Sequence, residues 1–408
     1  MLLRRTQFLL ALAGLAGLAL VSTGKPEPRR PHAPLRVRTG IDVLAARDFT
    51  LLRGKRVGLI TNQTGRSAEG RRTIDILAAA AEVTLTAVFA PEHGLEGELS
   101  GRVDDTVDNQ TRLRVHSLYG QTRRPTPEML RGLDALVFDL QDAGVRYYTF
   151  ITTMGYAMEA AAEHGLEFIV LDRPNPLNGV AVQGPALDAD RLNFEGYFSL
   201  PLRHGLTVGE LARLFNGEKK IGARLRVVRL ENWSRAMWFD ATGLAWVNPS
   251  PNLRSLPGNT FYPAVELLRA GDISVGRGTE TPFELFGAPW IDAAELARYL
   301  EARKIPGVRF TPTEFTPTSD VHAGHACHGV RLIVTDRESL DVGRLGVELL
   351  SALWRLYPRE FQLEKTIRLL GSQKTLARIR AGDDPAAIVN SWQEELEAFR
   401  ELRAPYLL

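Results

Sequence analysis

Short apolar runs alternate with longer amphipathic stretches through the first half of the chain. The predicted strands are 56–63, 83–90, 134–143 and 167–175, and the predicted helices between or after them are 71–81, 149–163 and 207–216. Strands that alternate with helices in this way predict βαβ units and a mostly parallel sheet. Because such crossovers are right-handed, helices should cover both faces of the sheet. The fold class is therefore α/β.

The second half of the chain follows a proline-rich stretch at 246–264, which is typical of an irregular connection between domains or a loop that lines a site. The elements expected beyond it are helices at 264–270, 293–302 and 342–356 and a strand at 330–335. Apolar residues then recur at spacings of three and four, at Ile388, Trp392, Leu396, Phe399 and Leu402. This periodicity predicts a C-terminal amphipathic helix that packs on the domain.

Polar residues follow four of the predicted strands. They are Asn62 and Gln63, then Glu92 and His93, then Asp139, Gln141 and Asp142, and finally Asp172, Arg173 and Asn175. Ligands of open α/β sheets bind beyond the carboxyl ends of the strands, so these groups are expected to converge on one rim. The alternative is that they are ordinary loop residues and helix caps.

The first segment of the chain has the pattern of an export signal. Arg4 and Arg5 precede an apolar run at 8–21, which is shorter than the roughly 20 residues that a membrane span needs. We expect a signal peptide at 1–24, with an uncleaved anchor as the alternative, followed by a proline-rich linker at 25–40. The mature protein should then work outside the cytoplasm in a bacterial envelope, as a periplasmic or secreted protein.

Composition narrows the function classes further. The chain has 408 residues, enough for two domains, and 50 Lys and Arg balance 48 Asp and Glu, which argues against nucleic-acid binding. A single cysteine, Cys327, excludes an intramolecular disulfide and a cysteine-rich zinc module. The chain also lacks a phosphate-binding loop, a serine nucleophile elbow and a zincin motif, which argues against those enzyme classes.

The segment 322–328 concentrates three histidines and the cysteine, so a metal site has to be considered. Ligands three residues apart in a glycine-containing loop rarely share one tetrahedral ion, and the segment runs straight into a predicted strand. We therefore favour a structural or pocket-edge role and expect neither a metal nor another cofactor. A metal-dependent esterase is the less favoured alternative.

Carboxylates and aromatic residues suit glycoside hydrolysis, which needs a carboxylic acid to protonate the leaving oxygen and a second group to act on the sugar or on water. Glu92 follows an apolar strand and a proline, where partial desolvation favours the protonated form of an acid. Possible partners are Asp139, Asp142, Glu280 and Glu284; possible sugar-stacking faces are Tyr147, Tyr148, Tyr262 and Trp290; possible carboxylate binders are Arg146, Arg173 and Arg277.

Six blocks of sequence resemble one family. They are GLITNQTG (58–65), FAPEHGLEGE (89–98), FDLQDAGVRYYTF (138–150), LDRPNPLNG (171–179), VNPSPNLRSL (247–256) and SVGRGTETPFELFGAPW (274–290). In this order they are similar to the NamZ-like exo-β-N-acetylmuramidases, and the resemblance covers essentially the whole mature chain. It implies a Rossmann-like N-terminal catalytic domain, taken as 41–257, and a smaller α/β domain at 258–408 that completes the cleft.

The resemblance also implies removal of terminal β-1,4-linked N-acetylmuramic acid from the non-reducing end of peptidoglycan fragments. Glu92 is then the candidate acid, and Tyr147 is the second candidate catalytic residue, either as a nucleophile like the tyrosine of sialidases or as a hydrogen-bonded wall residue. The motif positions expected around the substrate are Asn62, His93, Gln141, Asp142, Arg146, Asn175, Arg277, Glu280 and Glu284. The expected partners are muramic-acid-terminated saccharides, with membrane contact only through the signal segment. A non-catalytic cell-wall sugar-binding protein is the competing class.

Overall fold

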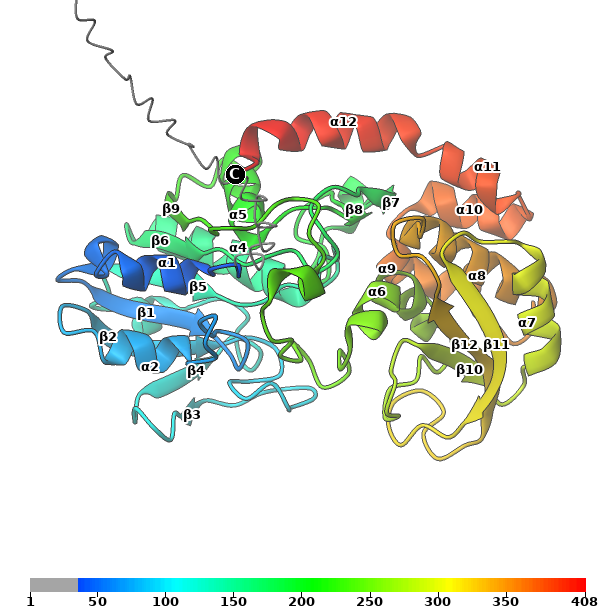
Figure 1. Ribbon diagram of the computed structural model, residues 1–408, viewed down its shortest axis with the longest axis horizontal. Helices are drawn as coiled ribbons and strands as arrows, with labels where there is room; N and C mark the ends of the chain where they lie inside the picture. Colours follow the sequence, from blue (N-terminus) through cyan, green and yellow to red (C-terminus); the bar gives the residue numbers. More distant parts are fainter. Residues whose placement is uncertain (1–35) are drawn as a thin grey trace, which may run out of the picture. The chain divides into compact units, whose positions relative to one another are not determined.

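A seven-stranded sheet forms the core of the N-terminal domain (Figure 1). Its strands are β1 (Arg56–Thr61), β2 (Thr84–Ala90), β3 (Thr106–Val107), β4 (Arg114–Ser117), β5 (Ala135–Asp139), β6 (Glu167–Leu171) and β9 (Arg224–Val228). They lie in the order β3-β4-β2-β1-β5-β6-β9. All neighbouring pairs are parallel except β3 and β4. The prediction of a mostly parallel sheet is therefore confirmed.

The computed structural model describes residues 36–408. The predicted signal peptide at 1–24 and most of the predicted linker at 25–40 lie outside the described residues. Within residues 36–408, no helix combines the length and the apolar character that a membrane crossing requires.

Helices cover both faces of the central sheet. Alternate side chains of a strand point to opposite faces, so β1 contributes Val57 and Leu59 to one core and Ile60 to the other. The helices α1 (Gly40–Ala46) and α2 (Thr73–Ala78) pack on the first face, and α4 (Thr149–Glu163) and α5 (Val208–Glu218) pack on the second. The sheet order reverses between β1 and β5, which is where ligand crevices form in this fold class.

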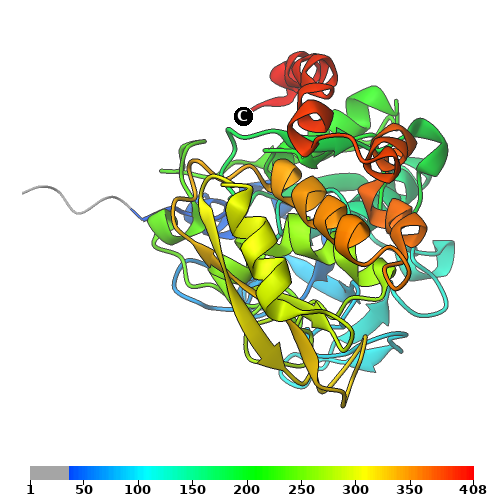
Figure 2. The same cartoon turned by 90° about the vertical axis from the view of Figure 1, so that its right-hand side faces the viewer.

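The smaller C-terminal domain is built on a three-stranded antiparallel sheet. Its strands are β10 (Leu285–Ala288), β11 (Val308–Phe315) and β12 (Cys327–Val334), in the order β10-β12-β11. The helix α7 (Ala293–Ala302) packs on this sheet (Figure 2), and α8 (Val342–Leu356) packs against α7. The same domain also contains α9 (Ile367–Leu370) and α10 (Gln373–Ala381). The N-terminal part of the chain further contains α3 (Pro127–Leu130) and the antiparallel pair β7 (Gln183–Ala186) and β8 (Pro201–Arg203).

The proline-rich stretch is more regular than expected. A helix, α6 (Leu256–Val265), begins there, and Ser255 caps it by accepting a hydrogen bond from the backbone N–H of Gly258. Pro257 lies in the first turn, where the missing N–H would have no partner in the helix anyway. The predicted helix at 264–270 is wrong in extent, because α6 ends at Val265 and a 3₁₀ turn, Glu266–Gly271, follows.

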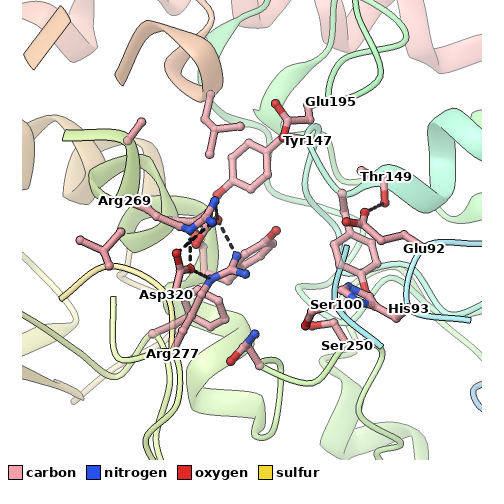
Figure 3. A pocket seen from close by; sticks show the side chains of 18 of the residues that line it. Glu92, His93, Ser100, Tyr147, Thr149, Glu195, Ser250, Arg269, Arg277 and Asp320 are labelled. Atoms are coloured by element: carbon pink, nitrogen blue, oxygen red, sulfur yellow. Dashed lines mark hydrogen bonds and ion pairs between the residues drawn. The ribbon is translucent and has the colours of Figure 1, made fainter. Parts of the chain in front are cut away.

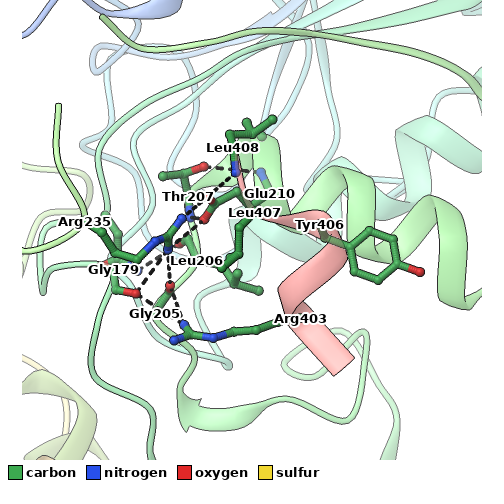
Figure 4. Close-up of polar contacts among 12 residues, drawn as sticks. Gly179, Gly205, Leu206, Thr207, Glu210, Arg235, Arg403, Tyr406, Leu407 and Leu408 are labelled. Carbon is green, nitrogen blue, oxygen red and sulfur yellow. Dashed lines mark hydrogen bonds and ion pairs between the residues drawn. The ribbon is translucent and has the colours of Figure 1, made fainter. Parts of the chain in front are cut away.

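The C-terminal amphipathic stretch forms two helices, α11 (Pro385–Asn390) and α12 (Gln393–Arg403). After α12 the chain returns to the N-terminal domain (Figure 4). There Arg403 donates hydrogen bonds to the carbonyls of Gly179, Val180, His204 and Gly205. The backbone N–H of Leu408 donates to Glu210. The end of the chain is thereby fixed to the domain that holds the central sheet.

Candidate active site

A cavity of about 690 Å³ lies between loops of the N-terminal domain and the C-terminal domain. Its volume falls within the roughly 300–1,000 Å³ of small-molecule sites. The N-terminal domain contributes Glu92, His93, Tyr119, Tyr147 and Thr149, among others. The C-terminal domain contributes Glu266, Arg269, Arg277 and Asp320. Both domains therefore have to be in place for the site to exist.

Glu92 stands at the edge of this cavity because strand β2 ends two residues earlier. The side chain is half-buried, and its Oε2 accepts a hydrogen bond of 2.5 Å from the Thr149 hydroxyl (Figure 3). Thr149 is the first residue of α4, so a long buried helix holds the donor in place. The carboxyl group is thus oriented by a rigid element.

His93 follows in a left-handed backbone conformation, with φ of 74°. Its Nδ1 lies 2.7 Å from the carbonyl oxygen of Leu99. Because a carbonyl can only accept, Nδ1 carries the proton, which leaves Nε2 as the other polar atom of the ring. His93, Ser100 and Gly101 of this loop line the cavity.

The opposite wall of the cavity carries two arginines and two carboxylates (Figure 3). Arg269 Nε lies 2.5 Å from Asp320 Oδ2, and Arg277 Nη2 lies 2.6 Å from Glu266 Oε1. Arg277 Nε is also 3.4 Å from Asp320. Burial raises the pKa of Glu266, and its Oε2 has no hydrogen-bond partner among the described residues. These four residues are referred to below as the charged wall.

Tyr147 lines the same cavity but is only 4% exposed. Its hydroxyl donates a 2.8 Å hydrogen bond to the backbone carbonyl of Tyr262. Burial raises the pKa of Tyr147 well above its ordinary value, so the phenol stays neutral at physiological pH. This geometry favours a wall residue over a nucleophile.

The polar residues that follow β1, β5 and β6 form a hydrogen-bonded network inside the protein. Arg173 Nε lies 2.5 Å from Asp139 Oδ1, and both side chains are buried. The backbone N–H of Gln141 donates to the Thr64 hydroxyl, which in turn donates to Asn62. The predicted polar residues after β1, β5 and β6 therefore meet one another, but they do not line the cavity of Glu92. Of the four predicted groups only the one after β2 lines it, so the expectation that all four share one rim is not met at this cavity.

Arg146 is buried and does not line the cavity. Its guanidinium donates to four backbone carbonyls, those of Pro185, Leu200, Leu369 and Leu370. Burial lowers the pKa of Arg146 to about 10. Because these four hydrogen bonds connect the loop before α4 to segments near residues 185, 200 and 370, Arg146 holds that loop in position.

The remaining predicted motif residues also lie outside the cavity lining. Asp142 accepts from the backbone N–H of Gly144, and Asn175 donates to the carbonyl of Leu206. Glu280 is exposed, and Glu284 accepts a 2.5 Å hydrogen bond from Ser255 at the start of α6. Of the predicted site residues, the structure brings Glu92, His93, Tyr147 and Arg277 together around the cavity. The predicted sugar-stacking residues Tyr148 and Tyr262 line it as well, and Trp290 does not.

The histidine-rich segment lies beside the cavity. His322 Nε2 is 2.9 Å from the carbonyl of Asp272, and Cys327 is buried at the start of β12. Within residues 36–408, no group of three or more His, Cys, Asp or Glu side chains is arranged to hold an ion. The loop before this segment does contribute Ser319, Asp320 and Val321 to the cavity.

Comparison with known families agrees with this architecture. The family model described as exo-beta-N-acetylmuramidase NamZ, N-terminal, matches residues 57–257, and its C-terminal counterpart matches residues 260–408. The chain belongs to the NamZ exo-beta-N-acetylmuramidase family. It is therefore a glycoside hydrolase. The peptidoglycan beta-N-acetylmuramidase NamZ of Bacillus subtilis (strain 168) is 42% identical over 414 aligned positions that cover all of both chains.

Two solved structures of DUF1343 family proteins from Bacteroides fragilis NCTC 9343 have the same fold. One superimposes with a TM-score of 0.85 at 37% identity, covering 92% of this chain and 100% of that chain. The other has a TM-score of 0.76 at 29% identity, covering 92% of this chain and 99% of that chain. The match extends across both domains of the NamZ-family chain.

Several cavity residues of this NamZ-family chain escape sequence reasoning. The sequence marks Thr149 only as the start of a helix, although its hydroxyl donates a hydrogen bond to Glu92. Glu266 and Arg269 lie in a stretch whose pattern predicts only a short helix, and Asp320 lies two residues before the histidine-rich segment without a motif of its own. One signal was available: Glu266 and Arg269 are three residues apart in a mostly apolar stretch, where charged residues are uncommon unless they are paired.

Proposed function

We propose that this enzyme releases terminal β-1,4-linked N-acetylmuramic acid from the non-reducing end of peptidoglycan fragments, with Glu92 as the general acid. One observation carries the proposal: Glu92 and the charged wall face each other across a single cavity of about 690 Å³. The activity named for the Bacillus subtilis relative supports the choice of sugar.

In the proposed reaction, the bond between the anomeric carbon and the glycosidic oxygen breaks. The oxygen takes the proton of Glu92 and leaves with the rest of the saccharide. The hydroxyl of a water molecule ends on the released sugar, and the remaining proton of that water returns Glu92 to its acid form. The Thr149 hydrogen bond at 2.5 Å holds one carboxyl oxygen, Oε2, so the other oxygen, Oε1, is the one offered to the substrate.

Selection of muramic acid requires a group that recognises its lactyl carboxylate, which N-acetylglucosamine lacks. Arg269 and Arg277 of the charged wall are the candidates, because a guanidinium binds a carboxylate through paired hydrogen bonds. Arg277 lies with its guanidinium 5.5 Å from the centre of the Phe283 ring, which fixes its plane. We assign Arg277 to substrate binding.

Tyr147 is assigned to the cavity wall in this proposal. Its hydroxyl bond to Tyr262 joins the N-terminal domain to α6, the helix that leads into the C-terminal domain. We place the division between the two domains at residues 257 and 258, within the first turn of α6. Tyr147 thereby positions one domain against the other beside the reacting sugar.

We also propose that the enzyme is exported by its segment 1–24 and works in the bacterial envelope. Arg4 and Arg5 followed by an apolar run at 8–21 support this. The proposed substrate is a component of the cell wall, so the location and the substrate agree.

The proposal is tested with Glu92→Gln and a chromogenic aryl glycoside of N-acetylmuramic acid. The variant keeps the shape of the side chain but has no carboxylic proton, so release of the chromophore should fall by about 10²-fold or more. Glu98→Gln is the matched control, because Glu98 is exposed on the same loop. Normal turnover by Glu92→Gln would refute the role of Glu92. Binding of the glycoside by the wild type without any turnover would favour the sugar-binding protein instead.

A further inference from the structure

A second hollow of about 280 Å³ adjoins the active cavity. Four residues line both: Tyr119, Thr149, Glu195 and Arg368. The hollow, referred to below as the side cavity, has three lining residues of its own, Arg123, Asn193 and Phe194. Because more than half of its lining is shared with the active cavity, the two spaces lie directly next to each other.

Glu92 stands at the junction of the two spaces. It lines the active cavity, while its hydrogen-bond donor Thr149 lines both. Tyr119 also lines both, and burial together with the neighbouring Glu92 carboxylate raises the pKa of Tyr119 to about 12. A general acid has to reach the oxygen between the released sugar and the leaving group. The two halves of the substrate must therefore lie on opposite sides of Glu92.

The charged wall indicates which cavity holds the terminal half of the substrate. It belongs to the active cavity and not to the side cavity, and it carries the arginines suited to the lactyl carboxylate. The terminal muramic acid then occupies the active cavity. The side cavity is left for the portion that departs.

The side cavity offers a prearranged donor. The Arg123 guanidinium lies 4.3 Å from the centre of the Phe194 ring and 5.3 Å from that of Tyr119, which holds its plane against the two rings. Among residues 36–408, no carboxylate lies within ion-pair distance of Arg123, in contrast to Arg368, which pairs with Glu195. The N–H groups of Arg123 are therefore available to oxygen acceptors of a ligand.

We propose that the side cavity binds the leaving-group sugar, an N-acetylhexosamine whose hydroxyl and acetamido oxygens accept hydrogen bonds from Arg123. This assignment rests on the proposed function, since it takes the position of Glu92 as the point of cleavage. It makes Arg123 a specificity-determining residue for the saccharide beyond the bond that is cleaved.

The test compares two substrates in the same variant. Arg123→Ala should lower kcat/KM for the disaccharide N-acetylmuramyl-β-1,4-N-acetylglucosamine by about tenfold or more, as expected for a lost charge-assisted hydrogen bond. For the chromogenic aryl glycoside, which presents no sugar to the side cavity, the loss should stay within about threefold, the scale of a weak cation–π contact. Arg131→Ala is the control, because Arg131 is exposed and lines neither cavity.

Equal losses on both substrates, or an unchanged kcat/KM for the disaccharide, would overturn the assignment. A loss seen only with fragments that carry a stem peptide would also overturn it, in favour of a peptide-binding role. If the wild type hydrolyses neither substrate, the proposed function itself fails. If it hydrolyses both and Arg123→Ala does not discriminate between them, only the side-cavity assignment fails.

Discussion

Asp172 is buried at the end of β6, and its ionisation should make the protein less stable as pH rises. The side chain is only 2% exposed. Its Oδ1 accepts hydrogen bonds from the backbone N–H groups of Gly209 at 2.8 Å and Arg173 at 3.0 Å, and its Oδ2 accepts from the Thr207 hydroxyl. Burial nevertheless dominates and, together with the nearby Glu210 carboxylate, raises the pKa of Asp172 to about 7.

The magnitude follows from the difference between the folded and unfolded pKa. An unfolded aspartate titrates near about 3.9, so the folded value lies about three units higher, and each unit corresponds to about 1.36 kcal/mol. Because the raised pKa favours the protonated form, the stabilisation is fully present below about pH 4 and is lost as pH rises to about 7, for a total of about 4 kcal/mol.

Asp172→Asn removes this titration. The amide oxygen still accepts from Gly209 and Arg173, and the amide nitrogen can donate to Thr207. We therefore expect the free energy of unfolding of the variant to change less between pH 5 and pH 8 than that of the wild type. At pH 8 the variant should be the more stable protein.

The assay is urea-induced unfolding followed by tryptophan fluorescence at pH 5, 6, 7 and 8. Asp190→Asn is the control, because Asp190 is exposed and should leave the pH dependence unchanged. Parallel pH profiles for Asp172→Asn and the wild type would refute the reasoning, as would a variant that is less stable at pH 8.

Three further predictions concern the active cavity. Thr149→Val removes the donor to Glu92 and should lower kcat on the aryl glycoside by about tenfold, from the loss of a hydrogen bond to a charged group; an unchanged kcat would contradict this. Tyr147→Phe leaves the Tyr262 carbonyl without its hydrogen-bond partner, so the free energy of unfolding in urea should fall by about 1–3 kcal/mol, while kcat should fall less than about tenfold. A fall in kcat of several orders of magnitude would instead support Tyr147 as the nucleophile. Burial raises the pKa of Glu266, so lowering the pH protonates Glu266 and frees Arg277 to bind a substrate carboxylate. KM should therefore rise with pH, and Glu266→Gln should flatten this dependence. The same slope in Glu266→Gln and the wild type would contradict a role of Glu266 in substrate binding.

The long helices were predictable because their periodicity is strong. The expected ranges 149–163, 293–302 and 342–356 match α4, α7 and α8 residue for residue. Each of these helices is ten or more residues long and buries one apolar face, so the periodic pattern is clear despite local exceptions. Four strands of the central sheet, β1, β2, β5 and β6, were recognisable as apolar runs because they are largely buried on both faces. The shorter or more exposed strands β3, β4 and β9 were not predicted.

Short elements and turns were less predictable. Helix α6 contains Pro257 and Pro263, and helix propensity alone predicts an irregular stretch there. Tertiary packing against α8 and the Ser255 cap stabilise it instead. Neighbouring residues in the sequence do not reveal that packing.

The candidate site was partly predictable. Glu92 and His93 follow a recognisable strand, and the loop that they begin opens on the cavity. The network of Asp139 and Arg173 looked equally suited to a ligand, because a sequence does not show that the two side chains satisfy each other. Asp320 reaches Arg269 from a segment 51 positions away in the chain, so their pairing exists only in the fold.

The central claim is tested most directly by the products formed from N-acetylmuramyl-β-1,4-N-acetylglucosamine and from the reverse disaccharide, N-acetylglucosaminyl-β-1,4-N-acetylmuramic acid. With mass-spectrometric detection, the purified wild-type enzyme should release free N-acetylmuramic acid from the first and leave the second intact. Glu92→Gln should release it at least about 10²-fold more slowly. Cleavage of the reverse disaccharide, or no free N-acetylmuramic acid from the first, would contradict the proposed function.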